Sequence, residues 1–587
     1  MERAILAEPA TFERMRADGW TLRPANVQHI TDSGDYSEPE AGTIELIAQM
    51  SGEARRGFEH IGTSVQGRDI VAVWMGQPPG SGAPSVRVLG AHHGDEWSSF
   101  ESALDLIDSI IERDGSDPAL TAVLDERTIW VVPWVNPDGV VARSRQNANN
   151  VDLNRNYDFA WSSSAWLAGD RPFSEPETRA VRAHAMVTTP PISLSLHSGA
   201  TNIGYVWNRT YAAAAEKPLI RALAEGYGAS CSTPDFWVTN GAAWYRSWGD
   251  TNDWSYGRYG GMDYTVELTL SKTPPASSIE TYVAEHRDAM LEFVSLPWSI
   301  SGRVVNADGE PLEAKLVLER DGVEISRPFP TDMQGGFART TDAAGAVLRV
   351  SAPGYDTTAV AADVGLTVTL SPSALGQVRA IPTRMGRAAV RVSVEGAADG
   401  PATLSQRMHE DVEATVLDGQ LSAGLLSGGA WTLVDSAGTA YPRVLLVEDD
   451  GLAQREDSGW SDEGFWMTGA NFAPGSRAWL ISTDAERRLV PMQVRLEEPG
   501  RLEATLQGMT EQPDVLVLTN GTWLAHTEVI APEPEPGPQD TADTNVLSQD
   551  TAEPAEEVRG QCGCNTRALA TYPWWVLLPV ALRRRRP

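Results

Sequence analysis

Two short stretches of the chain carry residue types that could hold a catalytic metal ion. His93 stands three residues before Glu96 in VLGAHHGDEWSSF, and a lone His197 follows much later in ISLSLHSGA. Two imidazoles and one carboxylate can bind a zinc ion and leave its fourth position open for water. Glu267, in DYTVELTL, is a further carboxylate that could take a proton from that water. The set predicts metal-assisted hydrolysis with one Zn²⁺ as cofactor.

The spacing of His93 and Glu96 is weak evidence by itself, because it occurs in many unrelated proteins. A buried histidine at the end of a strand is also more often a hydrogen-bonded structural residue. His92 competes with His93 for the role of ligand, but only His93 has the three-residue spacing to Glu96. If a strand delivers His93 and Glu96 opens the next helix, the two side chains converge. A third ligand must come from elsewhere in the chain, and His197 supplies it.

The surrounding sequence alternates between predicted strands and helices. Apolar runs predict buried strands at 69–75, 86–89, 128–135, 192–196 and 264–268. Apolar residues recur at helical spacing across 97–112, which predicts an amphipathic helix. The pattern indicates an α/β fold with a mixed sheet. His93 and His197 each follow a predicted strand, where functional groups gather in open sheets of this class.

A loop-rich stretch between residues 136 and 161 supplies polar side chains that could bind a substrate. Arg145, Asn154 and Arg155 lie in it. Guanidinium groups bind carboxylates through two hydrogen bonds and stabilise oxyanions. An isolated arginine is more often a solvated surface charge. A role of these residues in substrate binding therefore depends on the sequence motifs around them.

Those strings resemble the M14 zinc carboxypeptidases over about residues 30–297. In chain order they are HHGDE, NPDG, VDLNRN, FSEPET, LHSG, WYRSWGDTNDWSY and YTVELTLSKTPP. Arg145 precedes Arg155, and Tyr245 precedes Glu267, at the intervals typical of the family. The resemblance implies a mixed eight-stranded sheet flanked by helices. Two or three all-β sandwich domains are expected to follow it.

The resemblance also implies a role for each candidate residue. His93, Glu96 and His197 would bind zinc, Arg145 would polarise the scissile carbonyl, Asn154, Arg155 and Tyr245 would hold the terminal carboxylate, and Glu267 would be the general base. Such a site removes the last residue of a peptide or protein, because only a chain end presents a free carboxylate there. The expected partners are therefore peptide or protein C-termini.

The sequence after the candidate site resembles the N/E-like branch of the family. ISGRVVNADGEPLEAKLVLE is similar to the transthyretin-like domain that follows the catalytic domain in that branch. Enzymes of the branch prefer C-terminal Lys or Arg. This chain departs from their pocket pattern: Asn208 stands where they carry Asp, and GDTND, with Asp250 and Asn252, replaces GGMQD. These three residues are candidates for the specificity pocket, and the preference for Lys or Arg stays open.

Changes in composition and in the pattern of apolar residues predict seven segments of the chain. They are an N-terminal extension (1–31), the catalytic domain (32–297), a transthyretin-like β-sandwich (298–373), a β domain (377–448), an immunoglobulin-like domain of the IPT/TIG type (449–531), an acidic Pro-rich linker (532–561) and a C-terminal tail (562–587). The linker assignment follows from a Pro-, Asp-, Glu- and Thr-rich composition that favours an extended, solvated chain.

Composition and the chain ends limit the partners and the location. The formal net charge of −32 argues against nucleic acid as a partner. The apolar run 568–582, followed by Arg583 to Arg586, resembles the sorting tails of myxobacterial surface proteins. We expect an exported monomer that associates with the cell surface or membrane through this tail. The first residues contain no apolar signal segment, so a signal peptide is expected upstream of the start of this chain.

Two alternatives to a carboxypeptidase follow from the same residues. A cell-wall or γ-glutamyl peptide hydrolase of the same fold would act on peptidoglycan stem peptides. A catalytically silent surface protein would use the β domains for binding, but it would have no need to keep every chemical position filled.

Overall fold

The computed structural model describes residues 36–527 apart from short gaps, together with two short strands near the chain ends. The gaps are 375, 379–382, 386–388, 410, 450, 452, 462–463, 474, 485, 499 and 507–512. The end strands, β1 (Thr21–Arg23) and β32 (Ala581–Arg583), pair antiparallel. The predicted linker lies outside the described residues, as do most of the predicted N-terminal extension and C-terminal tail.

The predicted mixed sheet is confirmed, and it has eight strands in the order β2-β3-β5-β4-β6-β9-β7-β8. The strands are β2 (Arg56–Thr63), β3 (Asp69–Gly76), β4 (Ser85–Leu89), β5 (Thr128–Val132), β6 (Ile192–His197), β7 (Asn202–Tyr205), β8 (Trp237–Asn240) and β9 (Met262–Glu267). The central strands β5, β4, β6 and β9 are parallel to one another. Their carboxyl ends therefore meet at one edge of the sheet, where His197 and Glu267 are the last residues of β6 and β9.

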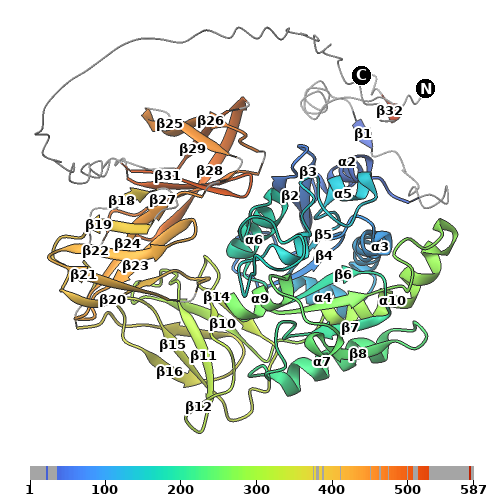
Figure 1. Cartoon of the computed structure of the whole chain (residues 1–587), viewed down its shortest axis with the longest axis horizontal. Coiled ribbons are helices and arrows are strands. Elements are labelled where there is room, and N and C mark those ends of the chain that lie inside the picture. The colour runs from blue at the N-terminus through green and yellow to red at the C-terminus, as the bar shows by residue number, and fades with distance from the viewer. Residues whose placement is uncertain are drawn as a thin grey trace, which may run out of the picture. The chain divides into compact units, whose positions relative to one another are not determined.

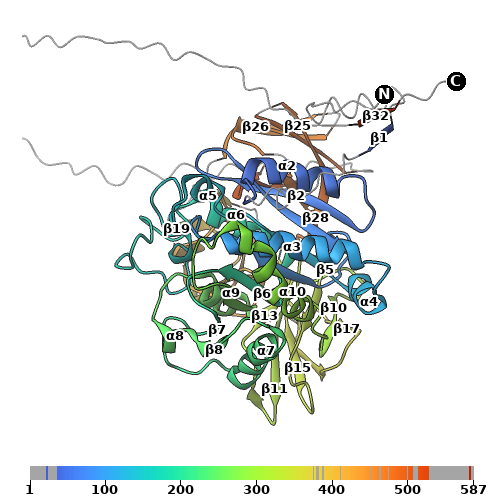
Figure 2. The ribbon, with the colours of Figure 1, turned by 90° about the vertical axis from the view of Figure 1, so that its right-hand side faces the viewer.

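Helices cover this sheet and keep its central strands buried (Figures 1 and 2). They are α2 (Pro39–Met50), α3 (Trp97–Arg113), α4 (Pro118–Glu126), α5 (Pro137–Ala142), α6 (Pro176–Thr188), α7 (Lys217–Ser230), α8 (Gly241–Trp244), α9 (Thr251–Tyr259) and α10 (Ile279–Val294), with short 3₁₀ turns at Leu153–Arg155 and Ala276–Ser278. The predicted helix 97–112 is α3, which buries Phe100, Leu104 and Ile107. Within the described residues, none of the helices has the length and apolarity needed to span a bilayer.

Three groups of strands follow the α/β part of the chain (Figure 1). We call them the first, second and third β domains. The first contains β10 (Ile300–Val305), β11 (Lys315–Arg320), β12 (Val323–Glu324), β13 (Phe329–Pro330), β14 (Gly336–Arg339), β15 (Val347–Ser351), β16 (Thr358–Ala361) and β17 (Leu366–Thr369), in sheets of three and five strands. All of these strands lie within the range predicted for the transthyretin-like sandwich.

The second and third β domains contain one seven-stranded sheet each. The second has β18 (Thr383–Met385), β19 (Ala389–Ser393), β20 (Gly400–Ser405), β21 (Val412–Leu417), β22 (Gln420–Leu425), β23 (Gly429–Val434) and β24 (Ala440–Val447). The third has β25 (Gln454–Ser461), β26 (Gly464–Ala470), β27 (Arg477–Ile481), β28 (Leu489–Glu498), β29 (Arg501–Thr505), β30 (Val515–Thr519) and β31 (Thr522–His526). Trp479 and Trp523 of the third domain are buried in the same apolar cluster as the eight-stranded sheet. The side chain of Asn520 accepts a hydrogen bond from the backbone of Thr63 in β2 at 2.7 Å.

A buried histidine behind the sheet makes the fold sensitive to acid. His286 in α10 donates from Nε2 to the carbonyl of Leu268 at 3.1 Å, and its Nδ1 accepts from the Tyr227 hydroxyl at 3.0 Å. Burial lowers the pKa of His286 to about 4, against about 6.5 in an unfolded chain. The unfolded chain therefore binds the proton first, so this contribution to stability is complete above pH 6.5 and is lost as the pH falls toward 4.

We expect the melting temperature to fall between pH 6.5 and pH 4.5, and to fall less in His286→Gln. Glutamine offers one donor and one acceptor in this region but takes up no proton. Thermal unfolding of both proteins across this pH range measures the effect. Equal slopes for the two proteins would show that His286 does not contribute to the acid sensitivity.

Candidate active site

Three side chains from separate elements converge at the carboxyl edge of the sheet. His93 lies in the loop after β4, Glu96 immediately precedes α3, and His197 ends β6. His93 Nδ1 lies 2.9 Å from Glu96 Oε1, and His197 Nδ1 lies 2.8 Å from Glu96 Oε2. The two Nδ1 atoms are 3.1 Å apart. Within the described part of the chain, this trio alone groups three or more possible ligands closely enough to share a metal ion.

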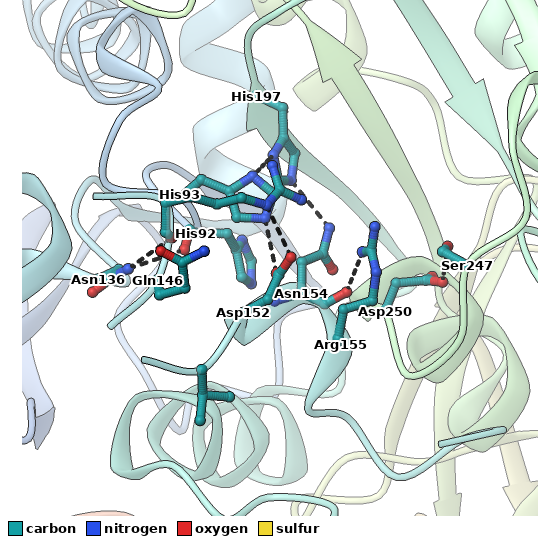
Figure 3. A network of polar contacts seen from close by, with 12 residues as sticks. His92, His93, Asn136, Gln146, Asp152, Asn154, Arg155, His197, Ser247 and Asp250 are labelled. Carbon is teal, nitrogen blue, oxygen red and sulfur yellow. Dashed lines mark hydrogen bonds and ion pairs between the residues drawn. The ribbon is translucent and has the colours of Figure 1, made fainter. Parts of the chain in front are cut away.

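The donor set fits a zinc ion. Ligand atoms about 2.1 Å from a tetrahedral zinc stand roughly 3.4 Å apart, so these atoms need to separate by only a few tenths of an ångström. Asp152 Oδ1 lies 3.0 Å from His93 Nε2 (Figure 3). When Nε2 carries the proton and donates it to Asp152, the lone pair of Nδ1 points toward the metal position. His93, Glu96 and His197 are all buried, which removes competing water.

Positive groups surround the carboxylate of Glu96. Its Oε1 lies 3.3 Å from Arg145 Nη1 and 3.1 Å from Lys272 Nζ. Burial alone would raise the pKa of Glu96, but His93 and His197 hold that pKa well below the usual range. Glu96 is therefore anionic, as a metal ligand must be.

Glycine allows the loop that carries His93 to approach its neighbours closely. A Cβ atom on Gly94 would lie 1.9 Å from the carbonyl carbon of Gly139, the glycine of NPDG. The side chain of Asn136, from the same motif, donates to the carbonyl of His92 at 3.3 Å. The strings HHGDE and NPDG are thus two halves of one packed structure.

His92, the competing histidine, has a structural role in this arrangement. Its Nε2 lies 2.8 Å from the Tyr157 hydroxyl, and its ring stacks on His197 with centroids 5.8 Å apart. It is not one of the three side chains that meet at the metal position. His92 therefore supports His197 from behind.

Glu267 lies directly beside His197, because the two residues are register partners in the parallel pair β6–β9. Its side chain is buried, and Oε2 has no hydrogen-bond partner among the described residues. Burial and the charge of Glu96 raise the pKa of Glu267 well above the ordinary glutamate range. A carboxylate with one unpartnered oxygen and a raised pKa is suited to taking up a proton.

The residues assigned to substrate binding lie along the chain segment that follows α5 and directly after α8. Arg145 Nε donates to Asp152 Oδ2 at 2.9 Å, and Asn154 Oδ1 accepts from the backbone of Thr251 at 3.0 Å. The guanidinium carbon of Arg155 lies 6.0 Å from the ring centre of Tyr245. The structure thus brings Arg145 and Asn154 next to the metal site and pairs Arg155 with Tyr245. Tyr245 remains 47% exposed, so a ligand can reach it.

The three candidate pocket residues lie at the start of α9 and beside it. Asp250 precedes α9, and its Oδ1 accepts from Asn208 Nδ2 at 2.9 Å while Oδ2 accepts from Ser247 at 2.7 Å. Asn252 donates to the carbonyl of Asp263 and accepts from Thr265 at 2.8 Å. Asp250 and Asn208 therefore share one hydrogen-bond network, whereas Asn252 is held against β9.

Two residues of the site were missed in the sequence. Asp152 orients both His93 and Arg145, and Lys272 lies within ion-pair distance of Glu96. Each stands inside a string that carried the family resemblance, VDLNRN and VELTLSKTPP. A search for a carboxylate able to accept the second ring proton of a ligand histidine would have singled out Asp152.

Comparisons with known proteins point to the same chemistry. Residues 47–289 match a family model described as zinc carboxypeptidase. Carboxypeptidase SOL1 of Arabidopsis thaliana is 30% identical over 276 residues, covering 44% of this chain and 56% of that protein. Carboxypeptidase M of Mus musculus is 27% identical over 330 residues, covering 50% of this chain and 73% of that protein. This chain spans little more than half of the length of the plant relative.

A solved structure of thrombin activatable fibrinolysis inhibitor shares 20% identity, with a TM-score of 0.42, over 49% of this chain and 80% of that one. The matched range includes the three residues that meet at the metal position and Glu267 beside them. The predicted zinc ligands are confirmed. Residues 47–289 are thus similar to the M14 zinc carboxypeptidases, and His93, Glu96 and His197 form a zinc site typical of that family.

Proposed function

We propose that the chain hydrolyses the last peptide bond of peptides or proteins. The observation that carries this proposal is the register of β6 and β9, which sets Glu267 beside the zinc ligand His197. A base carboxylate fixed next to an open metal position is what hydrolysis of an amide requires. When bound, zinc supplies a Lewis acid and lowers the pKa of water at the site.

Glu267 would take a proton from the attacking water and return it to the leaving amine. Its raised pKa supports the first step, because a more basic carboxylate takes up a proton more readily. Arg145, within reach of Glu96 and Asp152, would stabilise the charge that develops on the carbonyl oxygen. Neither role depends on the identity of the residue that is released.

Arg155 and Tyr245 would hold the terminal carboxylate, with Asn154 beside them. An arginine binds a carboxylate through two parallel hydrogen bonds, and a tyrosine hydroxyl adds a third donor. The cluster is accessible at Tyr245 and buried at Asn154, which suits an incoming chain end. Such a clamp supports exopeptidase action over cleavage within a chain.

We further propose a preference for C-terminal Lys or Arg. The side chain of Asp250 is buried beside the candidate clamp, and its charge acts on Arg155. Three donors, from Asn208, Ser247 and the backbone of Asp253, contact its two oxygens. A carboxylate has about four acceptor sites, which leaves room for one more donor from a basic substrate.

Replacing Asp250 by asparagine should lower the preference for C-terminal arginine over phenylalanine by about tenfold or more. Asparagine keeps the shape of aspartate and still caps a helix, so the change removes charge with little change in structure. The measurement is kcat/KM for a set of peptides that differ only in the last residue. Asp117→Asn is the matched control, because Asp117 caps α4 in the same way.

An unchanged ratio in Asp250→Asn would refute the role of Asp250 in basic preference. Release of residues from peptidoglycan stem peptides, with little release from ordinary Arg-ending peptides, would favour the cell-wall hydrolase instead. Zinc-loaded protein that releases no C-terminal residue from any peptide would overturn the carboxypeptidase proposal itself.

We also propose that the protein acts outside the cytoplasm, at the cell surface. The apolar run 568–582 and the arginines that follow it support this location, since positive charges behind an apolar stretch favour the cytoplasmic side. The remainder of the chain would then face outward. Action as a monomer remains part of the same proposal.

A further inference from the structure

The helix α9 connects the candidate specificity pocket to the first β domain. At its N-terminal end, Asp250 accepts a hydrogen bond from the backbone of Asp253, and Asn252 lies in the first turn. The backbone of Asn208 donates to Asp253 at 2.7 Å. The position of these pocket residues therefore depends on where α9 lies.

The C-terminal end of α9 is bound by two arginines of the first β domain. Arg327 Nη2 donates to the carbonyl of Gly257 at 2.6 Å, and Arg339 Nη1 donates to the carbonyl of Gly260 at 2.9 Å. The last carbonyls of a helix have no partner within the helix and carry partial negative charge. Guanidinium groups from another domain thus reinforce the local cap, in which the backbone of Gly260 donates to the carbonyl of Tyr256.

Arg339 also forms a buried ion pair that anchors the neighbouring loop. Its Nε and Nη2 donate to the two carboxylate oxygens of Glu216 at 2.8 and 2.6 Å, and both residues are buried. The hydroxyl of Tyr256 in α9 donates to the same carboxylate at 3.2 Å. Glu216 immediately precedes α7, so one carboxylate joins α7, α9 and the first β domain.

Arg327 reaches the other side of the pocket through aromatic rings. Its guanidinium carbon lies 5.6 Å from the ring centre of Trp207 and 5.7 Å from that of Phe159. Trp207 directly precedes Asn208, and its ring stacks on Phe159 with centroids 5.5 Å apart. A cation over an aromatic face is attracted to it, which holds the loop that carries Asn208.

We infer that Arg327 and Arg339 are positioning residues for the specificity pocket. They contact neither the zinc ligands nor Glu267 in the described structure, but both routes from them end at the residues around Asp250. The first β domain thus holds the pocket residues in place. Loss of these contacts would weaken binding of the substrate's last residue and leave the rate of bond cleavage unchanged. This inference rests on the proposed peptidase function.

The test is Arg327→Ala in the full-length, zinc-loaded protein. We expect KM for a peptide ending in arginine to rise about tenfold, with kcat changed by less than about twofold. This split follows because the pocket binds the ground state and the transition state alike. Zinc content should stay at one ion per chain. A role in global stability alone would instead reduce the active fraction, which lowers the apparent kcat and leaves KM unchanged.

Two further variants separate the contacts from general damage. Arg327→Lys keeps the charge but loses the planar guanidinium, so it should recover only part of the affinity. Arg320→Ala removes an arginine of the same domain that bonds to the carbonyls of Asp342 and Ala344, and it should leave KM unchanged. The pair Arg339→Gln with Glu216→Gln removes both buried charges together, avoids an unpaired one, and should raise KM as well.

Unchanged KM and residue preference in both Arg327→Ala and the paired variant would overturn the inference. If the wild-type chain cleaves no peptide, the proposed function fails. The inference is then tested by measuring the affinity for the peptide. Calorimetry then compares the affinity of the Arg-ending peptide for Glu267→Gln with and without Arg327→Ala. Equal affinities would overturn the inference, and about tenfold weaker binding would support it.

Discussion

Glu267→Gln is expected to abolish measurable turnover while zinc stays bound. Glutamine has nearly the same size and sits at the same register position beside His197, but it cannot accept a proton from water. General-base catalysis contributes about 10²–10⁴-fold, so the rate should fall by at least that factor. The measurement combines peptide hydrolysis, followed by release of the C-terminal residue, with metal analysis of the same sample.

Glu101→Gln is a suitable control for this loss. Glu101 is another buried glutamate of the catalytic domain, and it accepts hydrogen bonds from Ser37 rather than facing the metal position. The control should retain near-normal activity. Near-normal activity in Glu267→Gln itself would show that another group is the base.

His93→Ala should lose the zinc ion and with it all activity. The substitution removes one of three protein ligands and leaves Asp152 without the imidazole that it orients. Zinc measured after dialysis should drop from one ion per chain to less than about a tenth of an ion, since loss of a ligand costs far more than the 10–100-fold affinity loss seen for supporting residues. The stabilisation that bound metal gives to the folded state should disappear too.

The adjacent histidine provides the matched control. His92→Gln keeps a side chain that can donate to or accept from the Tyr157 hydroxyl and alters no ligand, so this variant should hold zinc at the wild-type level. Zinc loss in both variants would point to a damaged loop and not to ligation by His93. Stoichiometric zinc in His93→Ala would contradict the ligand assignment.

The zinc ligands could be predicted because local rules place them. A strand ends before His93, a helix begins after Glu96, and His197 ends a second parallel strand, so convergence at one sheet edge follows from topology. The predicted strand 128–135 was too long, because β5 ends at Val132. Trp134 and Val135 are buried in the loop that follows, so the apolar run continued past the last sheet hydrogen bonds.

The pocket and its supports could not be predicted in the same way. Whether Asp250 faces the clamp depends on the capping of α9, which is a matter of side-chain geometry and not of spacing. Arg327 and Arg339 lie far along the chain from Gly257 and Glu216, and arginines in a β domain normally indicate solvated surface. Only the packed structure shows that they bind the last carbonyls of a helix in another domain.

The shared burial of Trp479 and Trp523 has a consequence for synthesis of the protein. The catalytic domain leaves the ribosome well before the third β domain, which completes the apolar cluster behind β2 and α6. At about 5–20 residues per second, the intervening stretch takes roughly 10–50 s to make. During that time the catalytic domain presents an uncovered apolar face. Its apolar cluster is therefore complete only after the strands of the third β domain have been synthesised.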